Sequence, residues 1–375
     1  MPWQVQSLMS ARKEFVSLAR PGSINVAELC QRFGISRKTA YKWINRYAVQ
    51  GEAGLFDRPR KPLSSPTVTP LEVQKAIFEI RQMYPQWGGR KIRALLIRLG
   101  QVDAPAASTI SSILKRNGYI DPGESVKHHR WQRFEAPAPN DLWQMDFKGY
   151  FEAANQRCHP LTVLDDHSRY SICLKACENQ RADTVKAALT NTFRTYGLPR
   201  RILCDNGSPW GSDQENRYTG LTVWMIRRGI GVVHSRPYHP QTLGKGERFH
   251  RTLKAELINY CGDLDLNGCQ SRFDRWRNYY NADRPHEALD LEAPASRYIV
   301  SPRRFLESLP PIEYGPADEV RKVQQGGWLS YRGREYPVSK AFYGERVAIR
   351  PTKVDAVLDV YFCNQRIAQI NLRQD

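Results

Sequence analysis

The sequence contains no long apolar run. No stretch approaches the roughly 20 apolar residues of a membrane-spanning helix. The first segment, MPWQVQSLMSARKEF, also lacks the apolar region of a secretory signal. We therefore predict a cytoplasmic protein with no membrane partner.

Paired cysteines are missing as well. The eight cysteines are scattered, and no C-x-x-C pair occurs among them. Cys173 and Cys177 lie four residues apart, but no second Cys or His pair at the spacing of a zinc site accompanies them. The pattern favours reduced thiols and argues against a zinc site.

Acidic residues are scarce relative to basic ones. Lys and Arg number 56 against 38 Asp and Glu, which gives a net charge of +18. The first 140 residues hold 22 basic and 10 acidic side chains, so +12 of the +18 lies in the N-terminal third. Localised positive charge is typical of a protein that binds nucleic acid. A generally basic balance that serves only solubility is the alternative.

Residues 1–56 have the pattern of a helix-turn-helix domain. Asn25 begins a helix that runs to Phe33, and after a glycine turn Ser36 begins a basic helix, RKTAYKWINRYA. Four cations of that helix are predicted to contact DNA: Arg37, Lys38, Lys42 and Arg46. A plain three-helix bundle with a solvated basic face fits the same pattern.

A second helix-turn-helix domain is predicted over residues 71–119, between linkers at 57–70 and 120–140. The first linker, DRPRKPLSSPTVTP, holds four prolines and is expected to be extended. Three further DNA contacts are predicted in the second domain: Arg90, Lys91 and Arg93. Two linked modules suit an extended DNA site, because binding of one raises the effective concentration of the other.

Over residues 141–300 strands come first and then alternate with helices, which predicts a mixed α/β domain. In LWQMDFKG polar and apolar residues alternate, so Asp146 lies on the polar face of a strand. A short apolar strand, RRILC, leads into Asp205, and GKGERFHRTLKAELINY predicts a helix over 244–260. Short strands over 315–375 predict a small all-β barrel.

Three carboxylates lie at the ends or edges of these elements, namely Asp146, Asp205 and Glu247. An acid that ends an apolar strand is unusual unless it is paired or binds a cation. Mg²⁺ prefers oxygen ligands, and convergent carboxylates can hold two metals that cleave and rejoin phosphodiesters. By spacing alone, ordinary surface or capping acids are an equal alternative.

The helix that carries Glu247 is basic on the same face. His250, Arg251 and Lys254 follow Glu247 by three, four and seven residues, so we predict that they contact DNA beside the acid. An exposed array of helical salt bridges is the alternative.

Several motifs in order resemble the integrase core that retroviral integrases share with bacterial insertion-sequence transposases. They are QMDFKG, TVLDDHSR, LCDNGSPW, RPYHPQTLGKGERFHRTLK and YNADRPHEAL, closed by PASRY. The segments ISRKTAYKWINRYAVQGEAGLFDRPRKP and PQWGGRKIRALL resemble the tandem helix-turn-helix region of insertion-sequence transposases of the IS481 type, close to the IS3 type. The resemblance runs from residue 5 to about residue 300 and weakens over the C-terminal strands.

The resemblance implies an RNase H-like core and a catalytic triad of Asp146, Asp205 and Glu247 that binds Mg²⁺, with Mn²⁺ as a substitute. It implies double-stranded DNA as partner, both transposon ends and target. It further implies cleavage at the 3′ end of the element, strand transfer, and a dimer or tetramer at the bacterial nucleoid. Asp165 and Asp166 fall in the family's strand pair and turn, so we expect structural roles for them, with a direct contact to metal or DNA as the alternative.

The chain departs from the family in one spacing. Between Asp205 and Glu247 lie 41 residues, more than is usual, and we expect the extra length in a surface insertion, GSPWGSDQENRYTG. The departure makes Glu256 a rival for the third acid, although Glu256 lacks the flanking motif. Three residues in the motif loops are expected to help position DNA: Asn206, His239 and Gln241.

Two other functions fit parts of the pattern. One is a DNA-binding regulator with an inactive catalytic domain, against which the intact set of acids argues. The other is an RNase H-like nuclease that cuts DNA without joining it. The tandem helix-turn-helix modules and the RPH motif favour a transposase over both.

Overall fold

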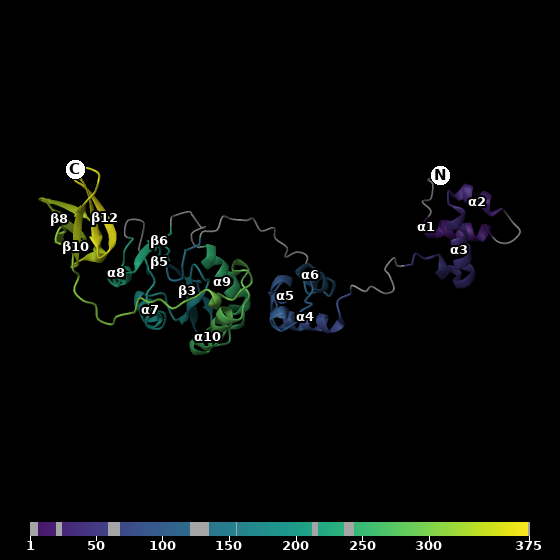
Figure 1. Ribbon diagram of the computed structural model, residues 1–375, viewed down its shortest axis with the longest axis horizontal. Coiled ribbons are helices and arrows are strands. Elements are labelled where there is room, and N and C mark those ends of the chain that lie inside the picture. Colours follow the sequence, from purple (N-terminus) through teal and green to yellow (C-terminus); the bar gives the residue numbers. More distant parts are fainter. Residues whose placement is uncertain are drawn as a thin grey trace. The chain divides into compact units, whose positions relative to one another are not determined.

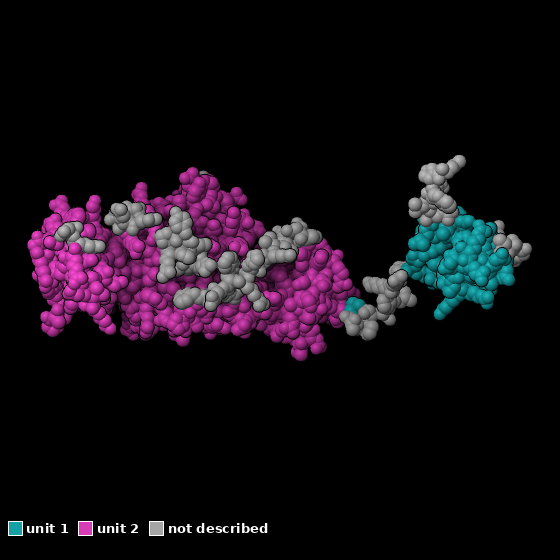
Figure 2. Space-filling view, turned by 90° about the horizontal axis from the view of Figure 1, so that it is seen from above, with its two compact units in different colours: residues 1–68 teal, residues 69–375 magenta. Residues whose placement is uncertain are grey.

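A computed structural model describes most of the chain (Figure 1). The described residues are 7–19, 25–58, 68–120, 135–154, 156–211, 217–235 and 244–373. The chain divides into two compact units, residues 1–68 and residues 69–375 (Figure 2). Our finer division of the second unit into three domains remains a prediction. No helix within the described residues is long and apolar enough to cross a membrane.

The first unit is helical, as predicted. Its helices are α1 (Leu8–Leu18), α2 (Val26–Phe33) and α3 (Arg37–Gln50). The Asn25 side chain accepts a hydrogen bond from the first turn of α2, and the Ser36 side chain does the same for α3. Gly34 ends α2 at a φ of 63°, a left-handed conformation that favours glycine. These caps hold α2 and α3 at the short turn that a helix-turn-helix requires.

The second unit begins with three more helices. They are α4 (Leu71–Met83), α5 (Gly89–Arg98) and α6 (Ala107–Arg116). Ile77, Ile92 and Ile110 bring one residue from each helix into a shared core. Gly89 lies where α5 meets α6, because a Cβ there would stand 2.2 Å from the Ala107 carbonyl oxygen. A larger residue at this position would force the two helices apart.

A mixed sheet of six strands forms the centre of the second unit. The strands are β1 (Leu142–Phe147), β2 (Phe151–Glu152), β3 (Arg157–Asp165), β4 (Ser171–Cys177), β5 (Arg201–Cys204) and β6 (Gly231–His234). Their order is β2-β3-β1-β5-β6, with β4 paired to β3. β1, β5 and β6 run parallel, whereas β3 is antiparallel to its three neighbours. The predicted mixed α/β architecture is confirmed.

Helices cover both faces of this sheet. They are α7 (Ala182–Tyr196), α8 (Gly220–Arg227), α9 (Gly244–Glu256) and α10 (Leu266–Ala282). Trp143 and Met145 of β1 share a core with α7 and α8. The opposite face packs Leu164 and Leu174 against α9 and α10. Because strand residues alternate, Asp146 points to the face that carries α9.

The C-terminal residues are rich in strands, as predicted. The strands are β7 (Glu319–Lys322), β8 (Trp328–Tyr331), β9 (Arg334–Pro337), β10 (Arg346–Pro351), β11 (Val357–Phe362) and β12 (Gln365–Asn371). Four form a sheet in the order β12-β11-β10-β7, and β8 and β9 form a separate hairpin. The pairings among the described strands do not join β12 to β7, so the predicted barrel is not confirmed.

Three local predictions need revision. The helix that we placed over 244–260 ends at Glu256 and is followed by a 3-10 turn, Ile258–Tyr260. The predicted surface insertion contributes to the core, because Trp210 is buried and its ring lies 5.9 Å from that of Phe147. Residues 135–140, assigned above to a linker, also pack on the sheet, since Ala136 is buried.

Candidate active site

Asp146 and Asp205 lie at the same end of two adjacent parallel strands. The register of β1 and β5 pairs Leu142 with Arg201 and Gln144 with Leu203. The same register, continued by two residues, sets Asp146 opposite Asp205. Neighbouring strands are about 4.8 Å apart, so the two acids lie side by side at the carboxyl edge of the sheet. Open α/β sheets usually bind their ligands at this edge.

The surroundings of the two aspartates oppose their negative charge. Burial, reinforced by the charges of Asp205 and Glu247, raises the pKa of Asp146 to about 6. Burial also raises the pKa of Asp205, although a hydrogen bond from the Gly207 amide partly offsets it. Two adjacent carboxylates in such a place are stabilised by a bound proton or by a cation.

Glu247 lies in the first turn of α9 and is exposed. Its charge contributes to the raised pKa of Asp146, and α9 packs on the face of the sheet to which Asp146 points. Among the described residues, however, no three His, Cys, Asp or Glu side chains are arranged to hold a metal ion. The carboxylate oxygens and negative charges of these acids suit a hard divalent cation. Asp146 and Asp205 are adjacent to each other, and Glu247 is the third acid nearby.

His250 faces inward, whereas we predicted that it contacts DNA. Only 7% of its surface is exposed. The Thr162 hydroxyl donates to the Asp146 carbonyl oxygen at 2.9 Å and lies 2.8 Å from Nε2 of His250. Burial lowers the pKa of His250 to about 4, so the imidazole is neutral at pH 7. His250 therefore supports the backbone of Asp146 through the Thr162 hydroxyl.

Glu256, the rival for the third acid, is engaged elsewhere. Its Oε1 accepts from Nη2 of Arg284 at 2.8 Å, and its Oε2 accepts from Nε of Arg284 at 3.1 Å. The indole of Trp276 lies against the same carboxylate at 3.3 Å. The arginine of the RPH motif is therefore the ion-pair partner of Glu256. The Glu256 carboxylate is engaged in this ion pair and not with the two aspartates.

Asp165 and Asp166 are fully buried, which agrees with the structural roles we expected. Asp165 accepts hydrogen bonds from the amide and hydroxyl of Ser168 and from the amide of Asn140. It thereby closes the turn between β3 and β4. Burial raises the pKa of Asp165, and the hydrogen bonds from Ser168 oppose that rise. Asp166 makes hydrogen bonds and an ion pair with a different set of residues, one of which lies in α9.

Most of the remaining predicted DNA contacts are exposed. These are Arg37, Lys38, Lys42, Arg90, Arg93, Arg251 and Lys254. Arg46 is half-buried beside the Trp43 ring. Lys91 is only 9% exposed, and burial lowers its pKa to about 8. In this conformation Lys91 is not presented to DNA.

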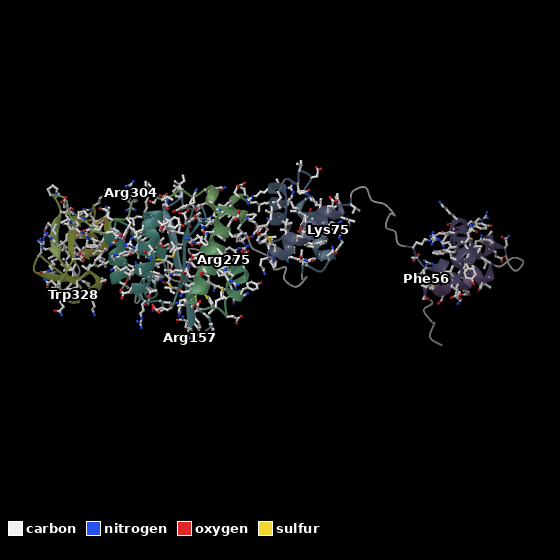
Figure 3. The ribbon with its side chains drawn as sticks, turned by 90° about the horizontal axis from the view of Figure 1, so that it is seen from below. Phe56, Lys75, Arg157, Arg275, Arg304 and Trp328 are labelled. Atoms are coloured by element: carbon white, nitrogen blue, oxygen red, sulfur yellow. The ribbon has the colours of Figure 1, made fainter. Side chains whose placement is uncertain are left out.

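The motif-loop residues are only partly described. The Asn206 side chain donates to the Ser235 carbonyl oxygen at 3.0 Å, which ties the segment after β5 to the end of β6. His239 and Gln241 lie outside the described residues. The described core also exposes cations that we did not single out, among them Arg157, Arg275 and Arg304 (Figure 3).

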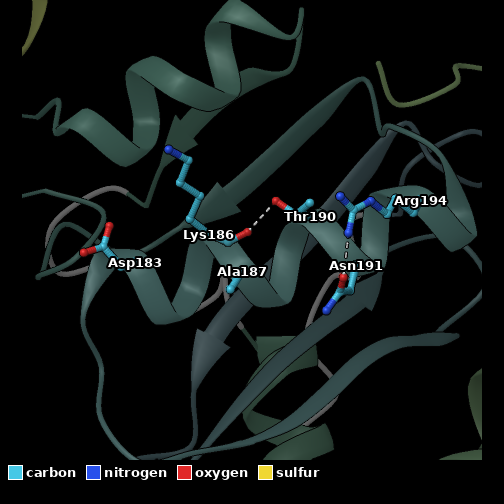
Figure 4. A pocket seen from close by; sticks show the side chains of 6 residues that line it. All are labelled: Asp183, Lys186, Ala187, Thr190, Asn191 and Arg194. Carbon is cyan, nitrogen blue, oxygen red and sulfur yellow. Dashed lines mark hydrogen bonds between the residues drawn. The ribbon is translucent and has the colours of Figure 1, made fainter. Parts of the chain in front are cut away.

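A hollow lies on α7 (Figure 4). It is lined by Asp183, Lys186, Ala187, Thr190, Asn191 and Arg194. None of the predicted site residues lines it, and part of its wall is fixed by a hydrogen bond from Arg194 to Asn191. The candidate site is therefore defined by the acids at the sheet edge.

Sequence reasoning missed two residues beside the acids. Gln144 shares a strand face with Asp146, and Lys245 precedes Glu247 by two positions. Both are bonded to Asp166. Their closeness to the motif acids was visible in the sequence, but their common partner was not.

Family profiles match nearly all of these regions. Two profiles of the integrase core domain match residues 136–240 and 228–294. A helix-turn-helix domain matches residues 11–62, and a homeodomain-like domain matches residues 39–114. The C-terminal domain of IS481 family transposases matches residues 318–375. The chain is an insertion-sequence transposase of the DDE type.

Curated relatives of the transposase come from mobile elements and retroviruses. A putative transposase of insertion sequence IS5376 from Geobacillus stearothermophilus is 21% identical over 93% of this chain and 84% of its own length. An uncharacterized protein of insertion element IS407 from Burkholderia multivorans is 27% identical over 58% of this chain and 78% of its own length. The Gag-Pro-Pol polyprotein of simian retrovirus SRV-1 is 30% identical over 32% of this chain and 6% of the polyprotein.

Solved structures similar to the transposase include a retroviral integrase core and a chain of a retroviral intasome. The HTLV-2 integrase catalytic core domain in complex with magnesium is 16% identical, with a TM-score of 0.35, and covers 44% of this chain and 99% of its own. A chain of the simian T-cell lymphotropic virus intasome is 17% identical, with a TM-score of 0.39, and covers 78% of this chain and 99% of its own. The integrase-core assignment rests on the two matching family profiles and on the mixed sheet.

Proposed function

We propose that the transposase binds the terminal inverted repeats of its own element and joins the element's 3′ ends to target DNA. The observation that carries this proposal is the pair of Asp146, near the end of β1, and Asp205, directly after the parallel strand β5, with Glu247 on the helix that packs on the same face. The integrase core profiles cover all three acids. A divalent cation, Mg²⁺ or Mn²⁺, would be held by these three carboxylates.

The helical modules supply recognition in this proposal. Exposed cations such as Arg37, Lys42 and Arg93 contact the phosphate backbone and bases of the terminal repeats. Arg251 and Lys254 lie on the same helix as Glu247 and hold DNA beside the acids. Phosphate contacts supply most of the affinity, and base contacts supply specificity.

The reaction has two steps at one site. Water first attacks the phosphorus at the element's end, and the element's 3′ oxygen leaves as a hydroxyl. That hydroxyl then attacks a target phosphorus, and the 3′ oxygen of the target leaves. When bound, the cation activates the attacking oxygen and stabilises charge on the phosphate. Asp146, Asp205 and Glu247 would hold it, and the chain forms no covalent bond to DNA.

Two ends must be cut and joined together, so at least two protomers are required. We propose a dimer or tetramer assembled on the two element ends. The predicted cytoplasmic location at the nucleoid fits a protein with this substrate.

A strand-transfer assay tests the proposal. Labelled DNA with the element's own ends is incubated with a supercoiled target and Mg²⁺ or Mn²⁺, with the wild type beside Asp205→Asn and Asp146→Ala. We expect joined product with the wild type, none with either variant, and nearly unchanged binding of the ends. Nicking without joining would favour the nuclease, and tight binding without either reaction would favour the regulator.

A further inference from the structure

The buried carboxylate of Asp166 connects three segments of the core. It accepts hydrogen bonds from the Ala136 amide at 2.7 Å and from Nε2 of Gln144 at 2.8 Å. Nζ of Lys245, in the first turn of α9, lies 2.5 Å from the same carboxylate. Asp166 is fully buried, so these contacts replace its hydration.

Gln144 links the Asp166 carboxylate to the backbone of α9. It lies two residues before Asp146 on the same face of β1 and is itself buried. Because its Nε2 donates to Asp166, its Oε1 is turned toward α9, where it accepts from the Gly246 amide at 3.2 Å. Gly246 is the third residue of α9, and the first four amides of a helix have no acceptor within the helix. A side chain of β1 therefore caps the helix.

Lys245 fixes the same turn electrostatically. Its ammonium group pairs with Asp166, and only 18% of its side chain is exposed. Removing one partner of such a pair leaves a buried charge without compensation. The two residues before Glu247 are thus both held in place. Lys245 is held through its side chain by Asp166, and Gly246 is held through its backbone amide by Gln144.

We propose that Asp166, Gln144 and Lys245 are positioning residues that set the first turn of α9, so that Glu247 reaches the pair Asp146 and Asp205. This inference rests on the proposed function, because it gives the network a task in assembling the three acids. None of the three positioning residues contacts the reacting atoms. Their effect is transmitted through the backbone of α9.

The test uses the full-length protein bound to DNA with the element's ends. Lys245→Met removes the ion pair, and Gln144→Leu removes the cap while it leaves the ion pair in place. Arg157→Met is the matched control, because Arg157 loses a pair with Glu152 that is exposed on both sides. Four quantities are measured: Mn²⁺ affinity by calorimetry, end-DNA affinity, the thermal unfolding midpoint, and the Mg²⁺ dependence of nicking.

We expect both network variants to bind Mn²⁺ about tenfold more weakly and to need about tenfold more Mg²⁺ for half-maximal nicking. End-DNA affinity should stay within about twofold, because the exposed cations are untouched. The control should match the wild type in Mn²⁺ affinity, in the thermal unfolding midpoint and in the Mg²⁺ dependence of nicking. Should Lys245→Met fail to fold, as judged by its unfolding midpoint, Gln144→Leu carries the test.

The decisive comparison repeats each variant in a Glu247→Gln background. If the network acts through Glu247, Lys245→Met and Gln144→Leu add no further loss of Mn²⁺ affinity there. An equal loss of Mn²⁺ affinity in both backgrounds overturns the inference. An unchanged Mn²⁺ affinity when Glu247→Gln is introduced alone also overturns it. If the wild type binds Mn²⁺ through Glu247 but neither nicks nor joins DNA, the proposed function is refuted. The inference about the positioning residues is then not refuted.

Discussion

The buried pair of Glu256 and Arg284 anchors the far end of α9. Glu256 is the last residue of that helix, and Arg284 follows α10. Their side chains are only 12% and 7% exposed. Two close contacts join them, at 2.8 Å and 3.1 Å, in the bidentate geometry that makes arginine–carboxylate pairs strong. We therefore expect Arg284→Met to destabilise the core.

The expected loss follows from the burial of the carboxylate. Removing one partner of a buried pair typically costs about 3–5 kcal/mol, because the other charge is left without compensation. Trp276 still donates one hydrogen bond to Glu256, which favours the lower end of that range. For a domain of this size, such a loss lowers the unfolding midpoint by on the order of 10 °C.

Differential scanning calorimetry of the full-length protein measures this shift. Arg297→Met is the control, because Arg297 pairs with the exposed Asp290 at 3.4 Å, and surface pairs contribute little. Adding Glu256→Met to Arg284→Met should restore part of the stability, since it removes the isolated buried carboxylate. If Arg284→Met lowered the midpoint no more than the control does, the account of Glu256 as a buried structural acid would be wrong.

Three further predictions concern recognition, pH and the C-terminal strands. Arg37→Gln should weaken binding to the element's ends and reduce the salt dependence by about one phosphate contact, measured by titration at several salt concentrations. Burial lowers the folded-state pKa of His286 to about 3, below the usual value of 6.5. The stability that His286 contributes is thus present above pH 6.5 and lost toward pH 3, by up to about 1.4 kcal/mol per pH unit. His286→Asn keeps an acceptor for the Ala288 amide and should flatten this slope in urea unfolding between pH 7 and pH 5; equal slopes would contradict the assignment. Gln365→Leu removes the two hydrogen bonds that Gln365 makes with the backbone of Val232 on the edge strand β6. Amide exchange in β6 should then accelerate, and unchanged exchange would show that this contact does not protect the edge.

Local patterns in the sequence were enough for much of the fold. The helix caps at Asn25, Gly34 and Ser36 were predictable, because capping depends on residues within one turn of the helix end. The faces of β1 were also predictable, because side chains alternate along a strand. Motif order identified the integrase core and predicted Asp146 and Asp205 as its acids.

Only the tertiary structure decided which side chains near the acids face inward. Helical spacing put His250 on the same face as Arg251, yet His250 packs on Thr162 beneath the sheet edge. Spacing also left Glu256 as a rival to Glu247, until Arg284, 28 residues away, was found beside it. Such contacts join segments that are distant in sequence, and no local periodicity encodes them.

The same reason separates Asp166 from the acids of the site. In the sequence it is one of two adjacent aspartates in a turn, with nothing to show which partner each would meet. In the fold it lies beneath the first turn of α9 and joins Gln144 to Lys245. The sequence by itself determined the elements and their amphipathic faces. The pairing of distant segments, which determines where each charge is buried and neutralised, was decided by the tertiary structure.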